Sequence, residues 1–254
     1  MARRLGRRKA PLREDYMLKE QKKVDDLFDT QTMMYLSKFF NKGIISRLEF
    51  KTAIGKESDI YIASPGAGLK NDYKFVILKF FRIETSTFFN MADYIIGDPR
   101  FSGIASSKTG VVKVWCKKEY GNLLIAKKCG LNAPKPFMFN GNILAMEFIG
   151  DEYGMPAPPL YKADIDNPEL MLDCILADVK KLYYGELVHA DLSEYNILVK
   201  DGKQYFIDFG QAVSLKHPKA REFLERDVHN ILQYFQKRYG VFRDLNDAIR
   251  AVIS

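Results

Sequence analysis

The chain contains 254 residues, enough to bury a full hydrophobic core in one large domain or in two lobes. With 47% apolar and 28% charged residues it has the composition of a soluble protein, and no apolar run approaches the roughly 20 residues of a membrane span. Its three cysteines form no C-x-x-C pair, and no apolar segment follows the basic N-terminus; this argues against a zinc site, a disulfide framework and secretion, and predicts a cytoplasmic protein.

Positive charge is concentrated at the N-terminus. The net charge is +7, and five basic residues lie within the first nine positions, before the first acidic residue, Glu14. A short cationic segment can bind phosphate backbones by releasing counterions, without reading base sequence. On composition alone, a solvated terminus without a partner is an equally good interpretation.

Residues 30–42 predict an amphipathic helix that ends at Gly43. Apolar residues recur there at helical spacing, at Met33, Met34, Leu36, Phe39 and Phe40. Such a stripe is typical of core packing rather than of a ligand site. We therefore expect residues 1–43 to form a basic tail and a helical extension that packs on the rest of the chain.

Three strands are predicted next, over residues 44–50, 59–63 and 73–81, with a turn at residues 64–68. In the third strand Lys79 follows three apolar residues, as the lysine of a V-A-I-K segment does when it contacts nucleotide phosphates. The alternative for Lys79 is a solvent-facing lysine on an edge strand.

A helix over residues 115–128 carries Glu119, a carboxylate suited to hold the Lys79 ammonium in place. The interval between these two residues is longer than in typical protein kinases. Residues from about 83 to 111 therefore form an insertion, and their many Ser, Thr and Gly residues predict a flexible loop near the nucleotide.

A strand over residues 144–149 is followed by a Pro-rich stretch and resembles a kinase hinge. Backbone groups of Glu147 and Ile149, next to Met146, would meet the edge of the adenine ring. The following helix begins with an Asn167 cap and Pro168, and Gly185 ends it.

Two motifs carry the chemistry. Residues 189–196 match H-x-D-x-x-x-x-N, in which Asp191 accepts a hydroxyl proton and Asn196 ligates magnesium. Asp208 begins a D-F-G motif that ligates metal, and a short hairpin connects the two motifs. Either motif alone is weak evidence, but together on one hairpin they predict an ATP- and magnesium-dependent phosphotransferase, with manganese as an alternative metal.

The last predicted helix, over residues 218–239, carries Asp227 among apolar residues. A buried carboxylate there requires hydrogen bonds. The alternative is an exposed acid paired with Arg226 or Arg221.

Several segments resemble the RIO-type atypical serine kinases, type-one branch, of archaeal type. Residues 189–196 match H-x-D-L-S-x-x-N, and residues 207–211 match I-D-x-G-Q. Residues 54–58 resemble the short G-K-E-S phosphate loop of that family, and residues 85–87 and 97–101 resemble the insertion of the type-one branch. The resemblance covers nearly the whole chain.

The resemblance implies an α+β, two-lobed protein-kinase-like fold with a truncated C-lobe: an N-lobe over residues 44–147 and a C-lobe over residues 148–254, after the helical extension. It implies nucleotide contacts from Gly55, Lys56 and Ser58 and structural support of the catalytic loop by His189 and Asp227. It also implies a serine/threonine kinase and ATPase that acts in small ribosomal subunit maturation. The expected partners are the small subunit or its precursor, with ribosomal RNA bound by the basic tail, and neither DNA nor a membrane. Autophosphorylation is expected on a serine of the insertion: Ser102, Ser106 or Ser107.

The sequence also departs from ordinary protein kinases. Gly55 stands almost alone where those enzymes carry G-x-G-x-x-G, and Ala190 replaces the Arg of H-R-D. No A-P-E motif occurs, so the platform for an extended peptide is missing. Two alternatives therefore remain at this point: a small-molecule phosphotransferase of the aminoglycoside or choline type, and an ATP-gated ribosome-binding module with little kinase activity.

Overall fold

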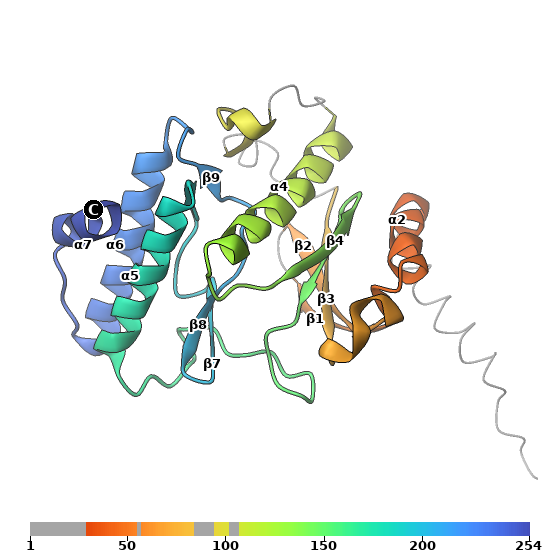
Figure 1. The fold of residues 1–254 in the computed structure, drawn as a ribbon, viewed down its shortest axis with the longest axis horizontal. Coiled ribbons are helices and arrows are strands. Elements are labelled where there is room, and N and C mark those ends of the chain that lie inside the picture. Colours follow the sequence, from red (N-terminus) through yellow and green to blue (C-terminus); the bar gives the residue numbers. More distant parts are fainter. Residues whose placement is uncertain (1–28, 55–56, 84–93, 102–106) are drawn as a thin grey trace, which may run out of the picture.

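The computed structural model describes residues 29–54, 57–83, 94–101 and 107–254. These residues form two lobes, a sheet-containing lobe and a mainly helical lobe, which lie side by side in Figure 1. The sheet is antiparallel throughout, with the order β1-β2-β3-β5-β4. Its strands are β1 (Ile45–Ile54), β2 (Ser58–Pro65), β3 (Val76–Phe81), β4 (Pro136–Asn140) and β5 (Ile143–Glu147).

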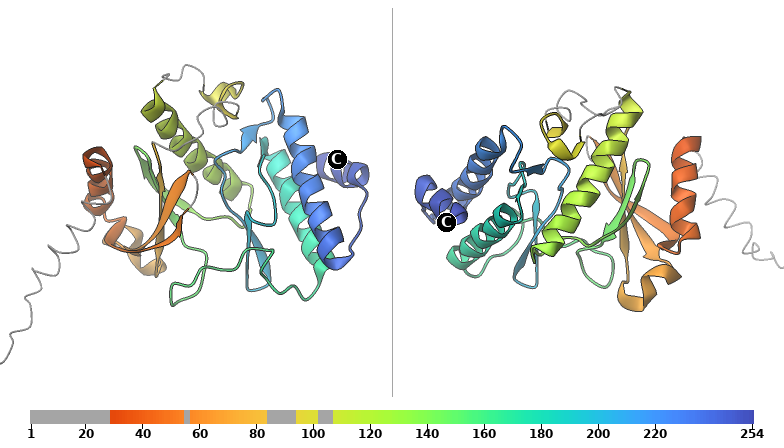
Figure 2. Two further views of the ribbon diagram at one scale, coloured as in Figure 1. Left: turned by 180° about the vertical axis from the view of Figure 1, so that it is seen from behind. Right: turned by 45° about the horizontal axis from the view of Figure 1, so that its top comes forward.

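Two helices cover opposite faces of this sheet, α2 (Thr30–Asn41) and α4 (Lys108–Lys128). Because side chains alternate along a strand, neighbouring residues of β5 enter different cores. Ala145 packs in a cluster with Leu36 and Phe39 of α2, whereas Leu144 packs in a cluster with residues of α4. Figure 2 shows α2 on the outer side of the sheet and α4 on the side of the helical lobe.

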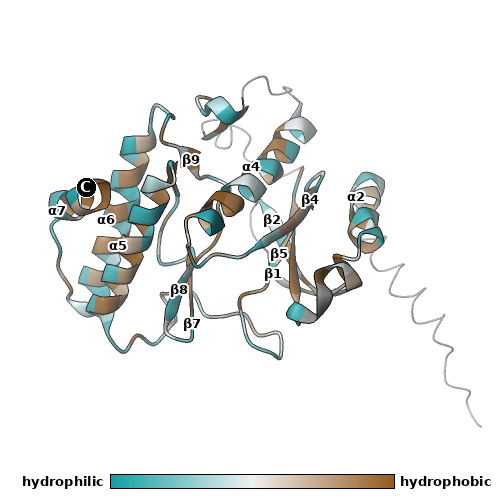
Figure 3. Ribbon diagram, viewed as in Figure 1, coloured by the Kyte–Doolittle hydropathy of each residue, from teal (hydrophilic) through white to brown (hydrophobic). Residues whose placement is uncertain are grey.

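The helical lobe contains α5 (Pro168–Tyr184), α6 (Ala220–Tyr239) and α7 (Leu245–Ile253). Figure 3 shows hydrophilic and hydrophobic residues alternating around α5 and α6, as expected for helices with one buried face. Two short antiparallel ladders lie between α5 and the sheet: β6 (Leu187–Val188) with β9 (Val213–Ser214), and β7 (Ile197–Lys200) with β8 (Lys203–Phe206).

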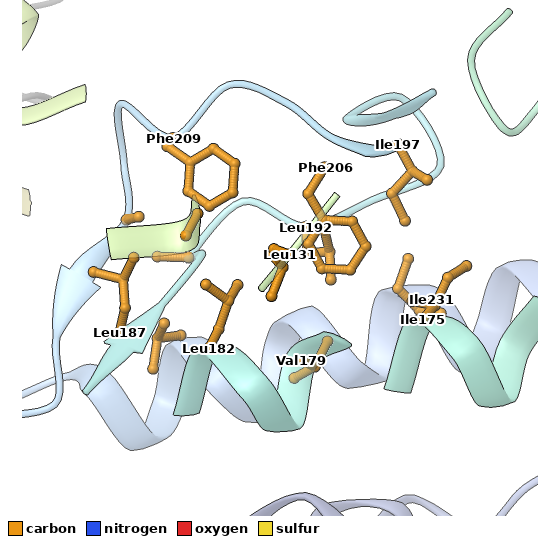
Figure 4. Close-up of a cluster of buried hydrophobic side chains, with 14 of the residues drawn as sticks. Leu131, Ile175, Val179, Leu182, Leu187, Leu192, Ile197, Phe206, Phe209 and Ile231 are labelled. Carbon is orange, nitrogen blue, oxygen red and sulfur yellow. The ribbon is translucent and has the colours of Figure 1, made fainter. Parts of the chain in front are cut away.

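The ladders are anchored by a buried apolar cluster beneath the two predicted motifs. Phe206 and Phe209 are both fully buried and belong to this cluster, together with Val179 and Leu182 of α5. Figure 4 shows the two phenylalanines among these apolar side chains. Asp208 lies between them in the sequence, so the packing of its neighbours fixes its position.

The structure corrects several sequence predictions. The helix predicted over residues 115–128 begins at Lys108, because Ser107 caps it by accepting a hydrogen bond from the Gly110 N–H at 3.2 Å. The last residues of the predicted insertion are therefore helical. The turn predicted at residues 64–68 begins later, since β2 continues to Pro65.

Further differences concern elements that the pattern did not indicate. β4 and α7 were not predicted. On α2, Met34 and Phe40 are exposed rather than part of the packed stripe, which consists of Leu36, Phe39 and the half-buried Met33.

None of the helices in the described part of the chain is long and apolar enough to span a membrane.

Candidate active site

Lys79 lies at the centre of the predicted site, on β3. Its ammonium donates to both carboxylate oxygens of Glu119 on α4, at 2.9 and 2.8 Å, and to Asp208 Oδ1 at 2.9 Å. Burial by itself would lower the pKa of Lys79, but the charges of Asp208 and Glu119 outweigh it and hold that pKa well above its usual value. Lys79 is therefore a fixed cation that joins the sheet, α4 and the D-F-G motif.

The sheet places Ser58 on the same face as Lys79. Ile60 is the cross-strand partner of Lys79 and Ser58 that of Phe81, and residues two apart on a strand share a face. Ser58 is buried at the start of β2. Its predicted neighbours in the phosphate loop, Gly55 and Lys56, lie outside the described residues.

Asp191 is held by two amide side chains. Its Oδ2 accepts hydrogen bonds from Asn196 Nδ2 and Gln211 Nε2, each at 3.1 Å. Burial, with a further contribution from the negative charge of Asp208, raises the pKa of Asp191 to about 6. A carboxylate with this pKa is ionised at neutral pH but is still basic enough to accept a proton.

The backbone of the catalytic loop is supported from α6. Asp227 is buried, and its carboxylate accepts from the Ala190 N–H at 2.7 Å and the Leu192 N–H at 2.9 Å. Arg226 donates to the Ala190 carbonyl oxygen. Ala190 has a φ of 63°, in the left-handed region, so this part of the loop is strained and requires such support.

His189 supports the neighbouring strand. Its Nε2 lies 3.0 Å from the Ile207 carbonyl oxygen, and burial lowers the pKa of this histidine to about 4. The ring is therefore neutral at pH 7, with its proton on Nε2. His189 joins the start of the catalytic loop to the residue before Asp208.

The donor set fits a magnesium ion bound together with nucleotide phosphates. The Asn196 amide nitrogen donates to the Asp191 carbonyl oxygen at 2.8 Å and to its carboxylate, which leaves Asn196 Oδ1 as the free ligand atom. Asp208 offers a carboxylate whose side chain is about half exposed, at 49%. In the described part of the chain no group of three or more His, Cys, Asp or Glu side chains is arranged to hold a metal ion, so phosphates and water would complete the shell, as is usual for magnesium.

Comparisons with known proteins identify the family. Residues 59–248 match the RIO domain model. The chain belongs to the RIO family of kinases. It is 45% identical over 180 residues to the RIO-type serine/threonine-protein kinase Rio1 of Thermoplasma acidophilum, covering 71% of this chain and 94% of that protein. It is 35% identical over 242 residues to the Rio1 kinase of Haloferax volcanii, covering 92% of this chain and 81% of that protein.

The fold is also that of solved RIO kinases. The Rio2 kinase of Chaetomium thermophilum superimposes with a TM-score of 0.66 at 22% identity, over 85% of this chain and 66% of that chain. A second structure of that kinase, a complex with ADP, Mg²⁺ and phosphoaspartate, gives a TM-score of 0.65 over 85% of this chain and 64% of that chain. The two-lobed kinase fold and the RIO resemblance are thus confirmed, and the chain is a serine/threonine protein kinase rather than a small-molecule phosphotransferase.

Two backbone groups of the predicted hinge have partners within the protein. The Glu147 N–H donates to the Lys135 carbonyl oxygen at 2.9 Å, so it is not available to adenine. The Ile149 carbonyl oxygen accepts from the Ala157 N–H at 3.0 Å. The Ile149 N–H, two residues beyond the end of β5, has no hydrogen-bond partner among the described residues, and its contact with adenine stays a prediction. Met146, within β5, forms a cross-strand pair with Ile77.

Of the predicted autophosphorylation sites, Ser102 and Ser106 lie outside the described residues. Ser107 caps α4, so its hydroxyl already accepts a hydrogen bond from the backbone. Phosphorylation of Ser107 would add negative charge at the N-terminus of a helix, where the helix dipole favours it.

Sequence reasoning gave no individual role to four residues that contact the site. They are Gln211, Arg226, Lys118 and Asn122. A signal existed for Gln211, since it follows the D-F-G motif and belongs to the I-D-x-G-Q signature. For the other three no local pattern distinguishes a residue on the buried side of a helix from one in solvent.

Proposed function

We propose that this RIO kinase transfers the γ-phosphoryl group of ATP to a serine hydroxyl in a magnesium-dependent reaction. The observation that carries the proposal is the Lys79 ammonium bound to both Glu119 and Asp208, together with an Asp191 carboxylate whose Oδ2 accepts hydrogen bonds from two amide side chains. One acid is thereby committed to cations, and the other stays available for the acceptor.

The chain's own residues have distinct roles in this reaction. Lys79 binds the α- and β-phosphates and is positioned for this by Glu119. Asp191 orients the acceptor hydroxyl and takes its proton as the new serine O–P bond forms and the bond from the γ-phosphorus to the β,γ-bridging oxygen breaks, which releases ADP. Magnesium held by Asp208 and Asn196 supplies charge neutralisation at the phosphate oxygens.

The test is transfer of label from ATP to the protein, with and without magnesium, followed by peptide mapping. We expect magnesium-dependent label on a serine of the insertion, within residues 102–107. Labelling that is equal in the parent protein and in Asp191→Asn would contradict the proposed transfer, and label confined to the terminal segments would contradict the proposed acceptor.

We also propose ATPase activity through an acyl phosphate on Asp208. The Asp208 carboxylate is half exposed beside Lys79, the residue that we propose binds the phosphates, and this supports the route. Its oxygen would attack the γ-phosphorus, ADP would leave, and water would hydrolyse the acyl phosphate. The Rio2 kinase structure with phosphoaspartate supports this route. Hydroxylamine should release such a label but not a serine phosphate, so the absence of any hydroxylamine-labile label would contradict the route.

A role in maturation of the small ribosomal subunit is the third part of the proposal. Its support is the basic N-terminal tail together with membership of the RIO family. ATP hydrolysis would then serve as the step that releases the particle, which requires the ATP and ADP states to differ in affinity for it.

A further inference from the structure

Two polar side chains of α4 bind the backbone that follows Asp208. Lys118 donates to the Gly210 carbonyl oxygen at 2.8 Å and to the Ala212 carbonyl oxygen at 2.6 Å. Asn122, one helical turn further along, donates to the Phe209 and Ala212 carbonyl oxygens, both at 2.8 Å. Both side chains are fully buried. Four hydrogen bonds therefore connect α4 to residues 208–212, which we call the metal loop.

Packing alone does not explain a lysine at position 118. No carboxylate forms an ion pair with its ammonium among the described residues. Burial, with a smaller effect of the Arg100 charge, lowers the pKa of Lys118 to about 7. An apolar side chain of the same length would fill the space without this desolvation cost. What the lysine adds is a pair of donors directed at the metal loop.

The metal loop has a conformation that needs such support. Asp208 has a φ of 62°, in the left-handed region that residues other than glycine rarely adopt. Gly210 lies against the Trp115 ring so closely that a Cβ there would be 2.8 Å from Trp115 Nε1. The loop is thus packed against α4 in a strained backbone conformation. The contacts with α4 that hold the loop therefore also set the direction of the Asp208 carboxylate.

Residues of the predicted insertion also bind Asn122 of α4. Arg100 donates from Nη1 to Asn122 Oδ1 at 2.9 Å, and its guanidinium forms an ion pair with the buried Asp98. Asp98 in turn accepts from the Ser214 N–H at 3.4 Å, just beyond the metal loop. Asn122 therefore uses its oxygen for the insertion and its nitrogen for the metal loop.

We propose that Lys118 and Asn122 are positioning residues that hold the metal loop on α4 in the conformation in which Asp208 binds the metal. The proposal rests on the proposed function, because it assigns the two residues to the metal site of the kinase. They act through the backbone and do not touch nucleotide or metal themselves. Without them the loop would lose its strained conformation, and metal-dependent nucleotide affinity would fall while metal-independent affinity would not.

The variants are Lys118→Met and Asn122→Leu, which keep approximate size and remove the donors. Each leaves the Ala212 carbonyl oxygen one remaining donor, so each single variant is expected to fold. Lys117→Met is the matched control: it makes the same change one position earlier, where the side chain is exposed. Melting temperature and far-UV circular dichroism verify folding.

The main measurement is ADP affinity by calorimetry, in EDTA and across a magnesium series, because ADP binding needs no turnover. For the parent and for Lys117→Met we expect the same increase in affinity with magnesium. For both donor variants we expect ADP affinity in EDTA within about twofold of the parent and a magnesium-dependent increase reduced by roughly tenfold or more, since the loss of a buried donor, which leaves a carbonyl oxygen unpaired, is worth about that much. The magnesium concentration that gives half-maximal ATP turnover should rise in parallel in the donor variants.

If Lys118 and Asn122 only stabilised the fold, their variants would show a different pattern of ADP affinities. Affinity that falls equally with and without magnesium would overturn the proposal, as would an unchanged magnesium increase in both folded donor variants. The emission of Trp115, the only tryptophan of the chain, provides a second signal because its ring contacts Gly210. We expect a shift to longer wavelength in the Asn122→Leu variant and none in Lys117→Met.

Hydrogen exchange on the unmodified, ligand-free protein tests the contact independently of the metal. We expect the Ala212 amide, which donates to the Phe209 carbonyl oxygen at 3.2 Å, to be protected from exchange together with the amides of α4, because the two segments open together. Rapid exchange of the Ala212 amide while α4 stays protected would refute the proposal. If the parent showed no magnesium-dependent ADP binding, the proposed function would fail, whereas the exchange result would still decide whether α4 holds the loop.

Discussion

Two residues of the site have strained backbone conformations, and buried polar side chains stabilise the backbone next to each of them. Ala190 and Asp208 both have left-handed backbone angles, which cost on the order of 1–3 kcal/mol each. Asp227 binds the two N–H groups that flank Asp191, and donors from α4 bind the carbonyls that follow Asp208. Asp191 and Asp208, the two carboxylates of the proposed site, therefore each lie next to backbone groups that buried polar side chains of a helix bind.

Replacing Asp191 tests the residue that we assign to the acceptor. In Asp191→Asn the amide keeps the size of the side chain but cannot accept the proton, so turnover should fall by roughly 10²-fold or more, with ADP affinity little changed. Steady-state kinetics and calorimetry measure the two effects. Asp201→Asn, at the exposed turn between β7 and β8, is the control and should retain full turnover. Comparable turnover in Asp191→Asn would refute the assignment.

Because of Lys118, the free energy of unfolding of the protein should vary with pH on the alkaline side of neutrality. Burial and the charge of Arg100 lower its pKa to about 7 in the folded protein, against the opposing charges of Asp98 and Glu119. In the unfolded chain the ammonium stays protonated to about pH 10.4. Between these values the unfolded state binds more protons, so the free energy of unfolding rises with pH, by up to about 1.4 kcal/mol per unit.

Urea unfolding at pH 7 and pH 9 measures this effect. Stability of the parent relative to Lys118→Met should increase over the interval, because the variant lacks this amine while the other groups that titrate there are common to both proteins. Lys117→Met should follow the parent. Parallel pH profiles for the parent and Lys118→Met would show that Lys118 keeps its proton in the folded state.

At the scale of elements, the sheet depends on a helix from each side. α4 supplies Glu119 and the contacts to the metal loop, while α2 closes the outer face of the sheet. The apolar stripe of α2 predicted a packed helix, but only the structure distinguishes its buried from its exposed members. Phe39 is fully buried and Phe40 is 40% exposed, although the two are adjacent.

These two phenylalanines provide a matched stability test. Phe39→Ala should lower the free energy of unfolding by roughly 3–5 kcal/mol, because it removes a buried ring and leaves a cavity. Phe40→Ala should cost less than about 1 kcal/mol, since its ring is already partly in water. Chemical denaturation gives both values. Equal losses would show that α2 packs differently on the sheet.

At the scale of the whole molecule, charge is distributed unevenly. Five positive residues of the basic tail lie within the first nine positions of a chain with net charge +7. The tail lies outside the described residues, and its positive charge is the feature that supports RNA binding. Phosphate contacts made in this way are sensitive to salt and insensitive to base sequence.

Comparing the full chain with one beginning at Pro11 tests the tail. We expect small-subunit RNA binding to fall steeply with salt for the full chain and similarly for unrelated RNA sequences. Without the tail, the slope of log affinity against log salt should decrease by up to about four, because up to five phosphate contacts are lost. Affinity titrations over a salt series measure the slopes. Identical slopes for the two chains would assign RNA binding to the folded lobes.

The sequence by itself determined the local chemistry of this protein. The spacing of Asp191 and Asn196, the D-F-G motif and the apolar run before Lys79 follow from short-range rules, so the motifs and most strands and helices were predicted from residues alone. Only the tertiary structure decided which polar side chains of a helix face inward. Lys117 and Lys118 are adjacent and chemically identical, yet one is in solvent and the other binds the metal loop. That difference arises from the rotation of α4 against a segment about 90 residues away, and the free energy of such long-range packing is not encoded in any local pattern.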